Sequence, residues 1–183
     1  MLSQYAIIKT IETIAKYPQK HFSVRELAKT AELRPAMASI ALGDMKRRDL
    51  VTLNRIGRTC QYRANLESPL MRQWKILFTL DKIEKAGLVR EAQEKIADIQ
   101  SILLYGSKAR GTDDEKSDFD LLIIAHNPPK HAELGAVDKL PDETNLLIYS
   151  PQEWKKKFIQ NKVFYENIIY ESIVLYGTRP VIA

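Results

Sequence analysis

The sequence predicts an α+β protein with a basic, helical front part and a back part that contains strands. Apolar residues recur at helical spacing through most of the first 50 residues. Apolar runs of strand length occupy 99–105 and 119–125, with a polar segment between them. Residues 1–66 contain 12 Lys and Arg against 5 Asp and Glu, whereas residues 67–183 contain 16 against 18. We therefore expect one domain at 1–66, a connecting helix at 67–87 and a second domain at 88–183.

Three helices are predicted in the front part. The first covers Gln4–Tyr17, where isoleucines recur at helical spacing. Ser23 and Glu26 have the spacing of a capping box, which opens the second helix. Pro35 suits the first turn of the third helix, where its missing N–H costs nothing. The expected buried stripe of the third helix is Ala38, Ala41, Leu42 and Met45.

Two strand-like runs follow, Leu50–Asn54 and Thr59–Ala64, and residues 55–58 are expected to join them as a hairpin turn. Gly57 can take the positive φ that such a turn requires. Three helices and a hairpin in this order resemble a winged helix-turn-helix domain. In that family the second helix of the motif enters the DNA major groove, and the hairpin contacts an adjacent groove or the backbone.

The resemblance implies that the front domain binds double-stranded DNA, and the basic surplus agrees with it. By itself, the Lys-Arg-Arg run at 46–48 is typical of a solvated helix C-terminus. The residues of the third helix that would face the bases, Ala36, Met37, Ser39, Ile40 and Gly43, include no Arg, Asn or Gln to read base edges, so we expect mainly phosphate contacts. Alternatively, Met37 and Ile40 belong to a protein interface. The predicted DNA-binding residues are Arg34, Ser39, Lys46, Arg47, Arg48, Arg55, Arg58 and Arg63.

A long helix is predicted from Ser68 to Lys85, with Gly87 ending it. Its apolar stripe contains Leu70, Trp74, Leu77, Phe78, Leu80 and Ile83. This stripe would pack the two domains together or pair with the same helix of a second subunit. We expect a homodimer.

The back part is predicted to alternate helices and strands. The expected helices cover 88–96, 108–110, 151–161 and 163–171, and the expected strands cover 99–105, 119–125, 145–149 and 173–176. Residues 127–139, which begin with Asn-Pro-Pro, are expected to form a loop.

Two carboxylates mark the candidate site. Asp118 and Asp120 are two residues apart at the start of a strand, so their side chains should share one face of the sheet. Adjacent carboxylates repel each other unless a cation lies between them, and a divalent metal is the usual solution. Gly106 and Ser107, in the turn after the preceding strand, offer N–H groups and a hydroxyl to a phosphate.

These residues resemble the minimal form of the DNA polymerase β-type nucleotidyltransferase superfamily. The positions that match its strand, Gly-Ser and Asp-x-Asp signature are Gly106, Ser107, Ala109, Arg110, Gly111, Ser117, Asp118, Asp120 and Leu121. The resemblance implies a small mixed sheet with flanking helices. It also implies that Asp118 and Asp120 hold Mg²⁺, with Mn²⁺ as the alternative, and act in catalysis. The implied nucleotide-binding residues are Gly106, Ser107, Lys108 and Arg110. An ordinary hairpin with an acidic rim is the alternative interpretation.

The same resemblance requires a third carboxylate on the next strand, and this chain departs from it. The expected position is Asn145, which can ligate a metal through its carbonyl but brings no charge. Glu143 has the same strand parity and could substitute if the register differs, and Asp142 is a further candidate. We therefore expect binding of NTP with Mg²⁺, and slow or absent transfer.

Two functions compete. The first is a DNA-binding transcriptional regulator whose back domain binds Mg–NTP or is catalytically slow. The second is an active nucleotidyltransferase that transfers NMP to a hydroxyl of a nucleic acid or a protein, as antitoxins of this type do. A pure interaction scaffold is the third. The longest apolar run is too short to span a membrane, no signal-peptide pattern is present, and Cys60 is the single cysteine, so we expect a cytoplasmic protein.

Overall fold

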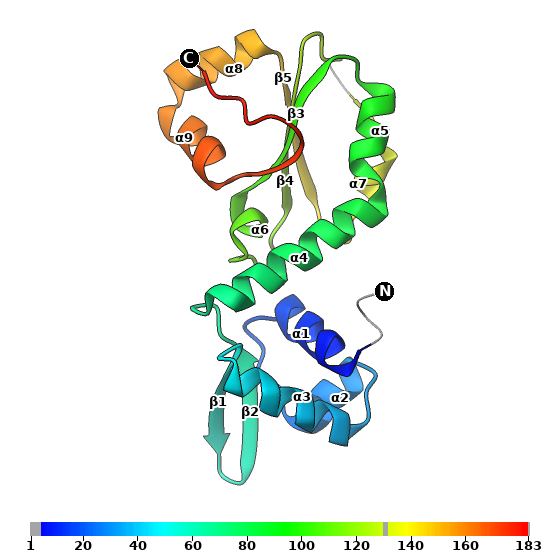
Figure 1. Cartoon of the computed structure of the whole chain (residues 1–183), viewed down its shortest axis with the longest axis vertical. Coiled ribbons are helices and arrows are strands. Elements are labelled where there is room, and N and C mark those ends of the chain that lie inside the picture. Colours follow the sequence, from blue (N-terminus) through cyan, green and yellow to red (C-terminus); the bar gives the residue numbers. More distant parts are fainter. Residues whose placement is uncertain (1–4, 130–131, 183) are drawn as a thin grey trace. The chain divides into compact units, whose positions relative to one another are not determined.

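The computed structural model describes residues 5–129 and 132–182 (Figure 1). Gln4, in the first predicted helix, and Lys130 and His131, in the predicted loop, lie outside the described residues. The described part contains nine helices and two small sheets, an α+β composition. It divides into two compact units, Met1–Phe78 and Thr79–Ala183. Within the described residues, every helix is too short or too polar to cross a lipid bilayer.

The front unit begins with three helices, α1 (Ala6–Lys16), α2 (Val24–Thr30) and α3 (Pro35–Arg47). The predicted capping box is present at α2, since Ser23 accepts the N–H of Glu26 and the Glu26 carboxylate accepts the N–H of Ser23. The buried stripe of α3 is the predicted one. The apolar faces of the helices form one core with Phe22, and its largest fully buried members include Ile14, Leu27, Leu42 and Met45.

The hairpin consists of β1 (Val51–Ile56) and β2 (Thr59–Ala64), paired antiparallel. Its first strand extends further than predicted, so Arg55 is a strand residue opposite Cys60. Gly57 has φ +59°, which permits a turn of two residues in place of the predicted four.

Helix α4 (Pro69–Ala86) ends before Gly87, which has φ +74°. Met71 and Phe78 are buried in the core of the front unit, and Ile83 and Ala86 are buried in that of the back unit. Two members of the predicted apolar stripe are not buried, since Leu70 and Leu77 are 46% and 41% exposed. The buried side of this part of the helix instead contains Met71, which was not predicted, and Phe78, which was. These two residues are seven positions apart and therefore lie on the same side of the helix.

The back unit contains a four-stranded mixed sheet in the order β5-β4-β3-β6. Its central strands β3 (Ile99–Tyr105) and β4 (Phe119–Ala125) are antiparallel to each other. At the edges, β6 (Ile173–Gly177) is antiparallel to β3, and β5 (Thr144–Tyr149) is parallel to β4. This mixed sheet agrees with the predicted fold class.

Five further helices accompany the sheet: α5 (Leu88–Lys95), α6 (Gly106–Arg110), α7 (Gly135–Asp138), α8 (Pro151–Gln160) and α9 (Lys162–Glu171). Helix α6 begins two residues earlier than predicted, directly at Gly106. The predicted loop at 127–139 contains α7, because the Glu91 carboxylate accepts the N–H groups of Gly135 and Ala136 at its first turn.

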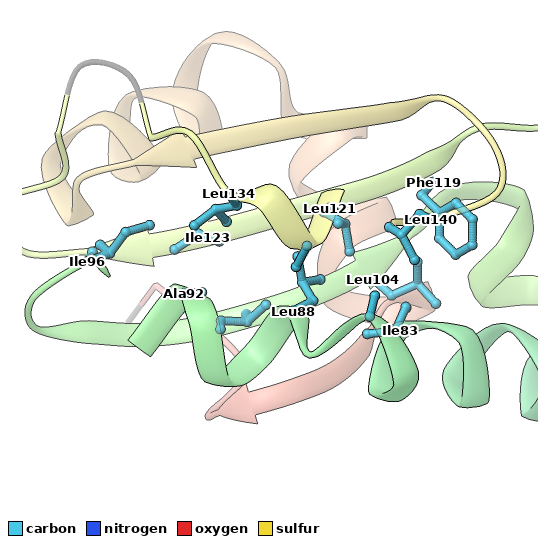
Figure 2. Close-up of a cluster of buried hydrophobic side chains, with 14 of the residues drawn as sticks. Ile83, Leu88, Ala92, Ile96, Leu104, Phe119, Leu121, Ile123, Leu134 and Leu140 are labelled. Carbon is cyan, nitrogen blue, oxygen red and sulfur yellow. The ribbon is translucent and has the colours of Figure 1, made fainter. Parts of the chain in front are cut away.

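Each face of the sheet has its own core. Phe119, Leu121 and Ile123 of β4 point to the side of α5 and α7, where Figure 2 shows them with Leu88 and Ala92. Leu122 and Ile124 point to the opposite side and pack with Trp154 of α8 and Ile168 of α9. The alternation along β4 therefore fixes which residues face which layer of helices.

Candidate functional site

The two predicted carboxylates lie at one end of β4, on the side of the sheet that α8 and α9 cover. Phe119 and Leu121 are fully buried on the opposite side. Because side chains alternate along a strand, Asp118 and Asp120 share the other face. Both carboxylates remain partly exposed, so a ligand can reach them.

Asn145 forms a hydrogen bond with each of the two carboxylates. Its Nδ2 donates to Asp118 Oδ2 at 3.1 Å and to Asp120 Oδ1 at 3.2 Å. The parallel register places Asn145 directly opposite Asp120 and Thr144 opposite Phe119. Of the candidates for the third acidic position, the structure thus brings Asn145, and not the carboxylate of Glu143, between the two aspartates.

The Gly106 backbone lies against Asp120. Gly106 has φ +74°, and a Cβ built on it would come within 2.1 Å of Asp120 Oδ2. A side chain at this position would therefore be strained by the backbone conformation and would displace the Asp120 carboxylate. The close approach places the Gly106–Ser107 turn beside the carboxylates, as the sequence predicts.

Tyr105 is a member of the site that sequence reasoning missed. It lies opposite Asp120 in the β3–β4 register, on the same face, and its ring contacts Phe164 of α9 edge-on with centroids 5.9 Å apart. Burial, with smaller contributions from the negative charge of Asp120 and from Tyr149, raises the pKa of Tyr105 to about 12. Its place immediately before Gly106 was the available signal.

Lys108 and Arg110 point in different directions. The Lys108 ammonium is buried, 2.9 Å from Asp142 Oδ2 and 4.5 Å from the centre of the Phe119 ring, so it lies toward the face opposite the two aspartates. Arg110 pairs with Glu171 of α9 at 2.8 Å, and both side chains are 43% exposed. Of the two predicted nucleotide contacts, Arg110 is the one whose side chain extends toward the face of the carboxylates.

The donor set suits one divalent cation. The two carboxylates on one face supply the hard oxygen ligands that Mg²⁺ prefers, whereas the group that Asn145 directs at them is its amide nitrogen. Within the described residues, no group of three or more His, Cys, Asp and Glu side chains with metal-binding geometry occurs. Asp118 and Asp120 are the residues that would hold a divalent cation here.

The predicted DNA-binding residues are distributed over α3 and the hairpin. Arg47 and Arg48 both pair with Asp44, at 3.0 and 2.9 Å, yet remain 74% and 61% exposed. These pairs lower the pKa of Asp44, with the hydrogen bond from Arg48 as the largest cause. Arg34 is the N-cap of α3, Ser39 and Lys46 are exposed on α3, Arg55 and Arg58 are exposed in the hairpin, and Arg63 is half-buried on β2.

The chain matches the family described as polymerase beta, nucleotidyltransferase, over residues 88–180, just over half of its length. A Methanocaldococcus jannaschii protein described as a putative protein adenylyltransferase is 64% identical over 33 residues, which cover 18% of this chain and 22% of that protein. A chain from a crystal structure of a toxin–antitoxin with AMP-PNP is 21% identical, with a TM-score of 0.39, and the match covers 50% of this chain and 72% of the other.

Proposed function

Because the chain belongs to the polymerase β-type nucleotidyltransferase family, we propose that it transfers a nucleoside monophosphate from a nucleoside triphosphate to a hydroxyl group of a protein. The family matches the unit that contains the described carboxylates and the Gly106–Ser107 turn. Of the two functions that the sequence suggests, the transferase receives this support, whereas no comparison supports a transcriptional regulator.

One observation carries the proposal: Asp118 and Asp120 share a face of the sheet, and Asp120 adjoins the Gly106 backbone. A triphosphate needs positive charge and N–H donors beside it, and the carboxylates need a cation between them. A bound Mg²⁺, or Mn²⁺ in its place, would supply the charge that neutralises both the carboxylates and the triphosphate. Gly106 and Ser107 would bind the β- and γ-phosphates, with Arg110 beside them.

The proposed transfer is a substitution at phosphorus. The acceptor oxygen forms a bond to the α-phosphorus, the bond from that atom to the β-phosphate oxygen breaks, and pyrophosphate leaves. The hydroxyl proton passes to solvent, because the position opposite Asp120 is Asn145, which cannot accept it as a carboxylate would. This leaves the chain with a slower reaction than a site with three carboxylates.

A protein is the proposed acceptor because the M. jannaschii relative, matched over 22% of its length, is described as a putative protein adenylyltransferase. Transfer of AMP adds a phosphodiester and a negative charge to a side-chain hydroxyl. A nucleic acid is the competing acceptor, and the test must distinguish the two.

The test is label transfer from α-³²P-ATP with Mg²⁺ or Mn²⁺ into a cell extract, with one sample treated with nuclease and one with protease. We expect label in protease-sensitive material, and none with Asp118→Ala or Asp120→Ala. Glu115→Ala, which removes an exposed carboxylate from the neighbouring polar segment, is the matched control and should transfer normally. Nuclease-sensitive label would show that the acceptor is a nucleic acid and not a protein. Label transfer that persists in both aspartate variants would contradict the proposed role of Asp118 and Asp120.

DNA binding by the front unit is a second candidate function. It rests on the surplus of seven basic residues, 12 against 5, within residues 1–66, and on the exposure of Arg55 and Arg58 in the hairpin. A winged helix-turn-helix, a homodimer and a regulatory role are further predictions for this unit.

A further inference from the structure

Asn145 occupies the position where a cation would compensate two carboxylates. Its amide nitrogen is the donor to both Asp118 and Asp120, at 3.1 and 3.2 Å. An amide NH₂ group has two hydrogens, so one group can satisfy an oxygen of each carboxylate. The reverse orientation would direct the amide oxygen at two negative groups, which repel it.

We propose that Asn145 is a latch: its NH₂ group holds the two carboxylates together in the metal-free protein, and its amide must turn when a cation enters. The cation site belongs to the proposed function, on which this inference rests. With the nitrogen between the carboxylates, the place of the cation is taken by a donor. After rotation, the amide oxygen faces the cation as a ligand.

The two hydrogen bonds from Asn145 offset part of the repulsion between the carboxylates. Two carboxylates at the end of one strand repel, and in a partly buried position the repulsion lowers stability. The parallel register keeps Asn145 opposite Asp120, so the hydrogen bonds need no rearrangement of the backbone. The amide is neutral, however, so it lowers the repulsion without removing the site's charge.

The latch also opposes metal binding. A cation that enters the native site must break two hydrogen bonds to charged acceptors before it gains the amide oxygen. Asn145→Asp should bind a cation more tightly but be less stable without one, because three carboxylates repel each other in the absence of metal and all three attract a cation.

Asn145→Ala removes the latch and adds no charge. Asn127→Asp, at an exposed position two residues after β4 ends, makes the same change of charge away from the site and is the control.

The experiment is thermal unfolding of the full chain at pH 7.5 without nucleotide, first in EDTA and then over a titration with Mg²⁺ or Mn²⁺. We expect Asn145→Asp to have a Tm at least ~2 °C below the native chain in EDTA. We also expect it to bind Mn²⁺ about tenfold more tightly, which corresponds to about 1.4 kcal/mol. Asn145→Ala should lose Tm in EDTA and gain no affinity. An Asn145→Asp protein that matches Asn127→Asp in both readouts would overturn the proposal.

A spectroscopic measurement on the native chain tests the proposal even if a variant does not fold. In the ¹⁵N spectrum of the native chain, the side-chain NH₂ signals of Asn145 should shift on Mg²⁺ addition, while those of Asn127 stay in place. Signals that do not move at a saturating metal concentration would refute the latch. Neither readout involves NTP, so failure of nucleotidyl transfer and failure of the latch are separate results.

Discussion

At the scale of the residue, the site depends on one position, Gly106, where a side chain would be strained and would displace the Asp120 carboxylate. Gly106 combines φ +74° with direct contact between its backbone and the Asp120 carboxylate. Either condition alone favours glycine. Together they allow the Gly106 backbone to approach Asp120, because an added methyl group would occupy the space that the Asp120 oxygen fills.

We therefore expect Gly106→Ala to disrupt the site. The substitution should cost about 1–3 kcal/mol of stability from the backbone conformation. It should also displace the Asp120 carboxylate and weaken binding of an ATP analogue with Mg²⁺ by more than about tenfold. Urea unfolding and calorimetric titration measure the two effects.

Gly57→Ala separates conformation from contact. Gly57 has φ +59° and nothing within 4 Å of an added Cβ, so this variant should lose stability while its nucleotide affinity stays unchanged. Equal nucleotide affinity in Gly106→Ala and the native chain would contradict the proposed approach of the turn to Asp120.

At the scale of the element, the pairing of β4 with β5 assembles the site. The shared face of Asp118 and Asp120 was predictable, because alternation along a strand is a local rule. The position of Asn145 was predictable only as one of several candidates. Choosing among them required the register of a parallel strand whose paired residues lie 25 positions further along the chain, which no local pattern specifies.

The partners of charged residues were the least predictable feature. Lys108 was expected at the nucleotide, yet its ammonium pairs with Asp142, 34 residues further along the chain. Helix α7 was missed for the same reason, since four residues give no periodicity and the carboxylate at its first turn belongs to Glu91, 44 residues earlier. Contacts of this range follow from the tertiary fold, whereas sequence patterns report only neighbours.

Glu91 should stabilise α7 in a pH-dependent way. The hydrogen bond from Lys95, and then those from the N–H groups of Gly135 and Ala136, hold the pKa of Glu91 below its usual value. A carboxylate with a lowered folded-state pKa stabilises the protein above its unfolded pKa, and this contribution disappears as the pH falls through the folded value.

Glu91→Gln should therefore be less stable than the native chain at pH 7, and the difference should shrink as the pH falls below about 4.5. Urea unfolding at pH 7 and at pH 3.5 measures it. Glu94→Gln, an exposed change in the same helix α5, should leave stability unchanged at both values. A Glu91→Gln defect that is as large at pH 3.5 as at pH 7 would contradict the electrostatic origin.

At the scale of the whole molecule, charge is divided between the two parts of the chain. The surplus of +7 within residues 1–66 contrasts with −2 for residues 67–183. A field of one sign over a single unit attracts polyanions and raises their association rate. The family match covers residues 88–180, which lie in the nearly neutral part of the chain.

If the front unit binds DNA, its affinity must fall with salt because phosphate contacts release counterions. Arg55 and Arg58 are exposed and, within the described part of the chain, form no ion pair, whereas Arg47 and Arg48 share Asp44. Replacing Arg55 and Arg58 by Ala should reduce the slope of log K against log salt by about 1–2. The double change Arg47→Ala and Arg48→Ala should reduce the slope less.

Fluorescence anisotropy with a labelled duplex measures the slope. The control is the double change Lys155→Ala and Lys156→Ala, on exposed positions of α8, which removes the same charge from the back unit. A slope that responds only to the α8 change would move polyanion binding to the transferase unit, and a slope that responds to neither would remove DNA from the ligands of this chain.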